Sequence, residues 1–464
     1  MHKLSTLDAG FLLAETHHSP KHVGGVQIFQ LPSGKRPAWL RRMLEALKKV
    51  PPGFPFDHKL RDDSILSPFL VRDENFDIDY HVRHTVLPGP GTRDQLVEMI
   101  SRLHANLLDR ERPLWEFHLI EGLQNRQFAF YTKIHHAIAD GITFSRWFAE
   151  SGSVSPGDMD SRPIWRRDGH TGTPVEKVSP GKILSEGIEI LGTSVKTTAQ
   201  LSALGAKLIK RRIFEGKPQM ALPLGAPRTR LNVPTGAARN FCTLHYPIDE
   251  IHEMASSQGA SINDLVMTLS DLAVNRYLDD KGESPGEPLV VYMPVSLRKD
   301  QDDDGNLISL LQVKLASNHS NPLEALAQIS ASSRSTREFY DGLSRQAISL
   351  YTLGVAILPL GEELLRLDQV LPPAINLVIS NVPGPSRTMY FRGAELIEVY
   401  PVNLLPPAVA LNITVCSYAG QLFFGLVSGR TAIPDLQTLA NHLNDACREL
   451  RELALPGTER SSEA

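Results

Sequence analysis

Strand-like and helix-like patterns alternate along this chain of 464 residues, on both sides of a segment rich in glycine, proline and serine at residues 151–181. Such alternation favours sheets that are covered by helices, and a chain of this length is too long for one ordinary core. We therefore predict an α/β fold of two mixed-sheet halves. Strand-like patterns lie at residues 22–31, 76–88, 114–123, 127–136, 239–248, 287–297, 374–385 and, as a hairpin, 409–429. Helix-like patterns lie at residues 37–50, 92–109, 261–278 and 434–453.

The segment rich in glycine, proline and serine marks the predicted boundary between the halves. We place the first half at residues 1–150 and the second at residues 239–464. Residues 151–238 are predicted to form a linker, a long helix within 182–214 and a crossing loop. Because that helix ends in a basic run, two interpretations stay open: a connecting helix packed against the halves, or a helix on a membrane surface.

The composition is that of an ordinary soluble globular protein. Hydrophobic residues make up 42% of the chain, charged residues 22%, and the formal net charge is −4, which gives no sign of a nucleic-acid binder. The three cysteines are far apart and lack metal-site spacing, so a reducing cytoplasmic compartment is expected. We expect neither a secretory signal nor a membrane span, and we interpret the apolar run at 347–360 as a buried helix that ends near Pro359.

Two adjacent histidines, His135 and His136, end a predicted strand, and Asp140 and Gly141 follow where a helix begins. Successive side chains of a strand point to opposite faces, so a shared metal ion is the weakest of three interpretations. The others are two core histidines, or a general base with a structural neighbour. Asp140 could orient a histidine or pair with an arginine, and Gly141 permits close packing at the helix start.

No serine or cysteine lies within the stretch from His135 to Gly141, and the chain has no G-x-S-x-G motif. A covalent serine enzyme is therefore disfavoured. The pattern favours direct attack by a substrate group that a histidine activates.

The residues His135, His136, Asp140 and Gly141 resemble H-H-x-x-x-D-G, the signature of the CoA-dependent acyltransferase superfamily, which includes chloramphenicol acetyltransferase and peptide-synthetase condensation domains. Further blocks, in the same order along the chain, are similar to the bacterial wax ester synthase/acyl-CoA:diacylglycerol acyltransferase family. These blocks are residues 4–16, residues 22–29, Pro113-Leu114-Trp115, Asn263-Asp264 within 262–268, the run ending at Arg298, and residues 376–385 with Ser380 and Asn381.

This resemblance implies two chloramphenicol acetyltransferase-like halves with one active-site tunnel at their interface. It also implies that His136 is the general base, while His135, Asp140 and Gly141 shape the site. Acyl-CoA would be a substrate rather than a cofactor, with diacylglycerol or a long-chain alcohol as acceptor. The products would be triacylglycerol or a wax ester and CoA, without a covalent acyl-enzyme and without a metal.

Other residues of these blocks would support the substrate, the oxyanion or the local structure. Asn263 could donate a hydrogen bond to the oxyanion, although it could equally cap a helix, and Asp264 is more suited to a structural role. The superfamily pattern suggests that Arg298 pairs with Asp140 across the halves. The remaining supporting residues are Pro113, Leu114, Trp115, Ser380 and Asn381, with Trp115 expected in the core or in the tunnel wall.

Two departures leave the acceptor open: Lys21 stands where many relatives have methionine, and residues 151–238 match no motif. A different hydroxyl or an amine acceptor is one alternative. A non-catalytic protein that binds lipid or coats droplets is another. We expect a cytoplasmic protein that associates peripherally with a membrane or with lipid inclusions.

Overall fold

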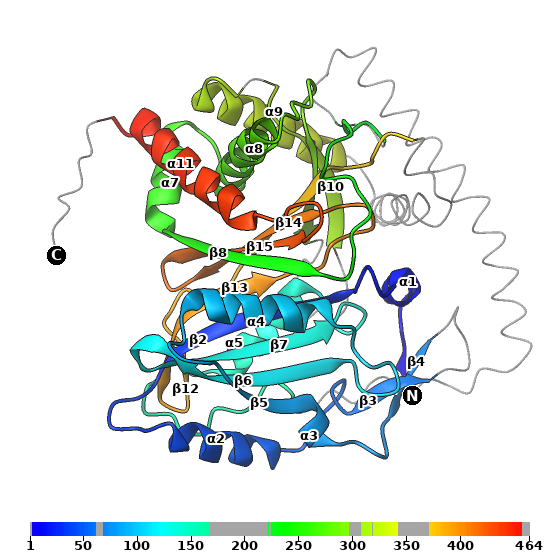
Figure 1. Ribbon diagram of the computed structural model, residues 1–464, viewed down its shortest axis with the longest axis vertical. Helices are drawn as coiled ribbons and strands as arrows, with labels where there is room; N and C mark the ends of the chain where they lie inside the picture. Colours follow the sequence, from blue (N-terminus) through cyan, green and yellow to red (C-terminus); the bar gives the residue numbers. More distant parts are fainter. Residues whose placement is uncertain are drawn as a thin grey trace, which may run out of the picture.

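The computed structural model describes residues 2–61, 68–167, 221, 224–296, 308–317, 319–341 and 371–456. Two sheets lie one above the other, the first built mainly from the blue and cyan part of the chain and the second from the green and orange part (Figure 1). The predicted helix within 182–214, the apolar run at 347–360 and Arg298 lie outside the described residues.

The first sheet has six strands in the order β12-β13-β2-β7-β6-β5. Strand β7 pairs antiparallel with β2 on one side and with β6 on the other, so both of its edges are hydrogen-bonded. The strands predicted at 22–31, 114–123 and 127–136 are confirmed as β2, β6 and β7. The bounds are β2 His22–Gln30, β5 Val82–Val86, β6 Trp115–Leu123, β7 Gln127–His135, β12 Tyr390–Phe391 and β13 Ala394–Val402.

The prediction of one extended segment across 76–88 is wrong in its first part. The Asp77 carboxylate accepts a hydrogen bond from the backbone N–H of Asp79 at 3.0 Å, and the short helix α3 (Ile78–His81) begins there. An aspartate in this position satisfies a donor that the first helical turn leaves unpaired. Strand β5 begins only at Val82 and runs parallel to β6.

Two predicted helices of the first half are confirmed. Helix α2 (Ala38–Lys48) buries one apolar face, made of Leu40, Met43, Leu44 and Leu47, and leaves its basic face outside. Helix α4 (Arg93–Ala105) begins at Thr92, which forms a capping box with Gln95. Helix α4 lies between the sheets in Figure 1, where the Ser101 hydroxyl accepts a hydrogen bond from the backbone N–H of Phe241 at 3.0 Å.

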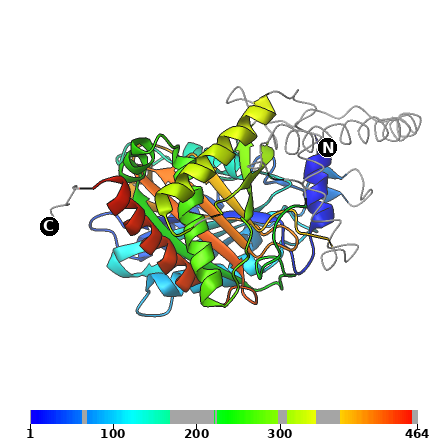
Figure 2. The ribbon, with the colours of Figure 1, turned by 90° about the horizontal axis from the view of Figure 1, so that it is seen from above.

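The second sheet also has six strands, in the order β10-β9-β11-β14-β15-β8. Helices α8, α9 and α11 lie side by side across its outer face (Figures 1 and 2). The patterns predicted from 239 onward are confirmed, including the hairpin at 409–429. The bounds are β8 Arg239–Pro247, α7 Ile248–Ser257, α8 Ile262–Asp280, β9 Val290–Ser296, β10 Ile308–Lys314, α9 Pro322–Asp341, β11 Leu377–Val382, β14 Leu411–Tyr418, β15 Gln421–Gly429 and α11 Leu436–Ala454.

The two sheets exchange part of the chain. After β11 the chain enters the first sheet, where β13 pairs antiparallel with β2, and then returns to the second sheet as β14. Tyr418 and Phe423 of the second sheet pack into the hydrophobic core of the first half. The second predicted half, 239–464, therefore contributes two strands to the first sheet, and the division into 1–150, 151–238 and 239–464 stays a prediction.

A small third sheet and helix α1 lie beside the end of the first sheet at which β2 begins (Figure 1). Helix α1 (Thr6–Ala14) begins at Ser5, which forms a capping box with Asp8. The sheet has the order β1-β4-β3, with β1 His2–Lys3, β3 His58–Arg61 and β4 Phe69–Arg72. None of the helices that the structure describes is long and apolar enough to cross a membrane.

Candidate active site

The two histidines lie where strand β7 leaves the first sheet. His135 is the last residue of β7 and stands opposite His22, the first residue of β2. The backbone N–H of His135 donates to the Leu114 carbonyl at 3.0 Å, and that of His136 donates to the Lys21 carbonyl at 2.8 Å. Backbone bonds on both sides therefore fix the position of the pair.

His135 is fully buried, and its neighbours fix the orientation of its imidazole. Its Nδ1 accepts a hydrogen bond from the Ala137 backbone N–H at 3.1 Å, so the proton belongs on Nε2. That Nε2 lies 3.4 Å from Oε1 of Glu15, whose other oxygen lies 3.1 Å from Nη2 of Arg110. Glu15 also accepts a hydrogen bond from the Lys21 backbone N–H at 3.0 Å. His135 is thus held in one tautomer and one orientation.

The Glu15 carboxylate is 2% exposed, yet it is ionised at neutral pH. Burial alone would raise its pKa. The hydrogen bond from His135, the hydrogen bond from the Lys21 backbone N–H and the charge of Arg110 together outweigh burial and lower the Glu15 pKa to about 2. A negative charge therefore remains beneath His135 across the physiological range.

His136 is turned differently from its neighbour and is partly exposed. Its imidazole stacks on the ring of Phe11 in helix α1, with ring centroids 4.0 Å apart. Burial lowers the pKa of His136 to about 4; the Asp140 carboxylate opposes this shift, and the positive charge of Lys21 adds to it. At neutral pH the His136 imidazole is therefore uncharged and able to accept a proton.

Asp140 begins helix α5 (Gly141–Ser151). Its buried carboxylate accepts a hydrogen bond from the Thr143 backbone N–H at 2.7 Å, so it caps this helix. A Cβ placed on Gly141 would lie 3.5 Å from Cγ2 of Val382 in β11, which is an ordinary contact. Gly141 therefore lies where α5 meets the second half. The predicted pair between Asp140 and Arg298 stays a prediction, because Arg298 lies outside the described residues.

The Pro113-Leu114-Trp115 block lies behind the histidines. Trp115 is 2% exposed, donates its indole N–H to the Phe56 carbonyl at 2.8 Å and stacks on His81. Leu114 packs with Leu4, Leu12 and Ala137 beneath the turn that carries His136. These contacts place the block in the core that supports the end of β7.

The blocks of the second half meet at the start of helix α8. The Asn381 amide donates to the Asn263 side-chain oxygen at 2.7 Å, which leaves the Asn263 NH₂ group as its donor. Ser261 caps the helix, and the Asp264 carboxylate accepts from the Ser261 backbone N–H at 3.0 Å and from its hydroxyl at 2.7 Å. Asp264 is thus part of a capping box, and Asn263 is not the cap.

Asn381 and buried Ser380 lie on strand β11, whose end touches the histidine-bearing half. The side chain of Val382 lies in contact with Gly141 of α5. The carbonyl of Pro383 accepts a hydrogen bond from the Ser145 hydroxyl at 3.1 Å. The structure therefore brings the second-half blocks to the same junction as the start of α5.

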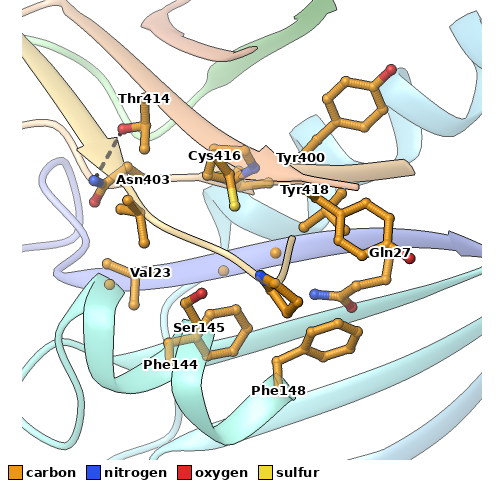
Figure 3. A pocket seen from close by; sticks show the side chains of 18 residues that line it. Val23, Gln27, Phe144, Ser145, Phe148, Tyr400, Asn403, Thr414, Cys416 and Tyr418 are labelled. Atoms are coloured by element: carbon orange, nitrogen blue, oxygen red, sulfur yellow. Dashed lines mark hydrogen bonds between the residues drawn. The ribbon is translucent and has the colours of Figure 1, made fainter. Parts of the chain in front are cut away.

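A pocket lies at this junction (Figure 3). Strand β2 and helix α5 supply one wall, and β13, β14 and the end of β11 supply the other. Gly141 and Val382 both line the pocket, so it begins at the contact between the halves. Its surface is mainly apolar, with side chains such as Val23, Phe144 and Phe148. A hydrocarbon chain suits such a lining.

Several residues of this arrangement were not predicted from the sequence. Glu15 and Phe11 belong to the block 4–16, but nothing in that block shows that they contact the histidines. The signal that could have identified Glu15 is an acidic side chain directly after the apolar last turn of a helix. Among the described residues, no group of three or more histidine, cysteine, aspartate or glutamate side chains has the arrangement of a metal site.

Comparison with known sequences identifies relatives along nearly the whole chain. A family model for the wax ester synthase/diacylglycerol acyltransferase catalytic domain matches residues 4–266, and a model for the C-terminal domain of the family matches residues 304–451. A putative diacylglycerol O-acyltransferase of Mycobacterium tuberculosis is 35% identical over 96% of this chain and 99% of its own length. The O-acyltransferase WSD of Acinetobacter baylyi is 32% identical over 96% of both chains.

Solved structures agree with these sequence matches. The wax ester synthase/diacylglycerol acyltransferase from Marinobacter aquaeolei is 30% identical, with a TM-score of 0.74 over 97% of this chain and 99% of that one. The first condensation domain of the CDA synthetase shares the fold, with 18% identity and a TM-score of 0.58 over 98% of this chain and 96% of that domain. The predicted chloramphenicol acetyltransferase-like halves are therefore confirmed. The chain belongs to the wax ester synthase/diacylglycerol acyltransferase family and is an acyltransferase.

Proposed function

We propose that this protein transfers a long-chain acyl group from acyl-CoA to the hydroxyl of diacylglycerol or of a long-chain alcohol. The products are triacylglycerol or a wax ester, together with CoA. The observation that carries the proposal is the neutral His136, held at the end of β7 beside the junction at which an apolar pocket begins. The names of the relatives support the same acceptors.

In the proposed reaction the His136 imidazole accepts the proton of the acceptor hydroxyl. The alcohol oxygen then attacks the thioester carbonyl and forms a C–O bond, which places a negative charge on the carbonyl oxygen. Collapse of this intermediate breaks the C–S bond, and the thiolate of CoA takes the proton from His136. No acyl group is bound to the protein at any step, in keeping with the lack of a serine or cysteine between His135 and Gly141.

The surroundings of His136 suit a base that gains and then loses one proton. The Asp140 carboxylate stabilises the imidazolium, whereas burial and the positive charge of Lys21 favour its deprotonation. We assign the oxyanion donor to the Asn263 amide, because its oxygen is engaged by Asn381 and its NH₂ group is the end that can donate. Donors already fixed in place stabilise the developing charge without reorganisation.

The proposal is tested by measuring release of the CoA thiol from palmitoyl-CoA, with diacylglycerol and separately with hexadecanol. We expect acceptor-dependent release by the unchanged protein and a loss of roughly a hundredfold or more in His136→Ala, since general bases contribute about that much. His252→Ala, at an exposed position of α7, is the matched control and keeps full activity. Folded protein that binds lipid but releases no thiol with either acceptor would instead be a lipid-binding protein.

We further propose that the protein acts in the cytoplasm while bound peripherally to a membrane or a lipid inclusion, where its apolar acceptors are dissolved. Helix α1 supports this, because Phe11 contacts His136 while Leu13, two residues on, is 47% exposed. An exposed leucine beside an active site suits contact with lipid.

We expect Leu13→Glu to weaken co-sedimentation with phospholipid vesicles that contain diacylglycerol, because a charged side chain disfavours insertion. The control is Leu453→Glu, which changes a similarly exposed leucine (44%) on helix α11 of the second half. Equal binding by both variants and the unchanged protein would argue against α1 as the lipid contact.

A further inference from the structure

The pocket between the halves contains one polar side chain that differs from all the others in its lining. Strand β2 directs Val23, Gly25 and Gln27 to the pocket, because alternate residues of a strand share a face. Figure 3 shows the Gln27 carboxamide beside the rings of Tyr418 and Phe148. Gln27 is 1% exposed, and its Oε1 accepts no hydrogen bond from any residue that the structure describes.

The neighbouring polar groups already have partners. The Tyr418 hydroxyl donates to the Leu396 carbonyl at 2.8 Å and accepts from the Met389 backbone N–H at 2.8 Å. The Asn403 amide donates to the Thr414 hydroxyl at 3.2 Å, as the dashed line in Figure 3 marks. None of these groups needs a ligand to complete its hydrogen bonds.

The Ser145 hydroxyl donates to the Pro383 carbonyl, so its proton is also engaged. Gln27 therefore stands out in this lining, since its carboxamide oxygen lies without a donor among apolar side chains. A buried amide oxygen without a donor is costly, and native proteins seldom leave one unsatisfied. Either a water molecule or a group of the substrate fits this position. Oxygen and nitrogen of the amide can exchange by rotation, so a hydroxyl, which both donates and accepts, pairs with either.

The register of the first sheet places Gln27 far from the reacting atoms. His22 stands opposite His135, and the backbone of Gln27 follows five residues later along β2, about 17 Å away at the rise of an extended strand, with its carboxamide turned back toward Gly25. The pocket begins beside Val23 and Gly141, next to the histidine motif, and extends to Gln27. A long chain that enters from the catalytic end would bring its far end to the carboxamide.

We propose that Gln27 recognises a hydroxyl at or near the far end of a long hydrocarbon chain, so that the pocket accepts ω-hydroxylated chains as substrates. This inference rests on the proposed acyl transfer and adds a class of substrate to it. The hydroxylated chain can belong to the acyl group or to the acceptor alcohol, and the same contact with Gln27 serves both.

The test compares two pairs of substrates in the unchanged protein and in Gln27→Met, which has a similar volume but no hydrogen-bonding group. The first pair is ω-hydroxypalmitoyl-CoA and palmitoyl-CoA, each with hexadecanol. The second is the α,ω-diol of hexadecane and hexadecanol, each with palmitoyl-CoA. Loss of one net hydrogen bond lowers the preference for the hydroxylated chain by roughly fivefold to tenfold. The pair that shows this loss identifies which substrate occupies the pocket.

Two controls make the result specific. The first control is α-hydroxypalmitoyl-CoA, whose hydroxyl lies beside the thioester. The kcat/KM for this substrate, divided by the kcat/KM for palmitoyl-CoA, stays the same in the unchanged protein and in Gln27→Met. Gln27→Leu repeats the substitution with a shorter apolar side chain, in case the methionine variant does not fold. A preference for the hydroxylated chain that survives in a folded variant overturns the proposal.

The proposal is also overturned if the unchanged protein rejects ω-hydroxylated chains and Gln27→Met turns over plain chains faster than the unchanged protein does. That result would assign a water molecule to the carboxamide. Failure of the proposed function gives a different result, namely no turnover of palmitoyl-CoA with hexadecanol. In that case calorimetric binding of ω-hydroxyhexadecanoic acid and hexadecanoic acid decides the role of Gln27, with tighter binding of the hydroxy acid, lost in Gln27→Met, as the expected result.

Discussion

At the scale of single residues, two adjacent histidines have different surroundings because the strand ends between them. His135 still follows the alternation of β7 and points into the protein, where Glu15 holds its Nε2–H. His136 lies in the turn that follows and stacks on Phe11. His135 is therefore fixed in place, which fits the proposal that the other histidine, His136, transfers the proton.

Lys21 connects several parts of this arrangement. Its backbone carbonyl accepts from the His136 N–H, and its buried ammonium group donates to the Ser19 hydroxyl and lies 3.4 Å from the carbonyl of Leu405 in the second half. Lys21, which stands where many relatives have methionine, thus places a positive charge near the proposed base.

The pH dependence of kcat/KM tests the effect of this charge. A neutral His136 is needed, so activity falls as the pH decreases through the His136 pKa of about 4. The charge of Lys21 lowers that pKa, and its removal in Lys21→Met stabilises the imidazolium and raises the pKa. We therefore expect the acid limb of the profile to move to higher pH.

The control is Lys49→Met, which removes an exposed lysine after helix α2 and leaves the acid limb in place. If Lys21→Met lowers kcat/KM equally at every pH, Lys21 acts through local structure and not through its charge.

At the scale of elements, helix α5 couples the histidine motif to the second half. Asp140 caps its first turn, Gly141 lies against Val382, and Ser145 bonds to the Pro383 carbonyl. The start of this helix therefore fixes both the turn that carries His136 and one end of the pocket.

Asp140→Ala removes the cap of α5 and is expected to lower the free energy of unfolding by about 1 kcal/mol. It also removes the carboxylate that stabilises the His136 imidazolium, so kcat falls by more than stability alone explains. Denaturant unfolding and CoA release measure the two effects.

Thr92→Ala is the matched control, because Thr92 caps α4 in the same way but lies away from the histidines. If both variants lose the same stability but only Asp140→Ala loses activity, the catalytic contribution of Asp140 is supported. Equal activity in both variants would reduce Asp140 to a helix cap.

At the scale of the whole molecule, the crossing strand β13 makes the two sheets depend on each other. It pairs with β2 in the first sheet and supplies pocket residues from Val399 to Val402. Where β13 crosses β15, a Cβ on Gly425 would lie 1.8 Å from the Pro401 carbonyl oxygen. The halves approach so closely there that only glycine fits.

Gly425→Ala is therefore expected to destabilise the protein by about 1 to 3 kcal/mol, because the backbone must shift to admit a methyl group. The same shift displaces the pocket wall and lowers kcat/KM for long chains. Gly236→Ala, where a Cβ meets nothing within 4 Å, is the control and should change neither thermal unfolding nor activity. An unaffected Gly425→Ala would mean that the junction adapts without cost.

The sequence by itself determined the main strands and helices with strong periodicity, the α/β class and the histidine motif. Hydrophobic periodicity is a local property, so β2, β7, α4 and α8 could be predicted from it, and the order of the motif blocks indicated the family. The short helix α3 was missed because one capping side chain, Asp77, decided it.

Only the tertiary structure decided which distant residues meet. Glu15 beneath His135, β13 beside β2, and Gln27 in the pocket all depend on contacts between segments far apart in the chain. Hydrophobic periodicity predicts which face of an element is buried, but it does not predict which other elements cover that face. Burial then set the pKa of His136, and the packing of the two halves around the pocket left the Gln27 oxygen buried without a donor among the described residues.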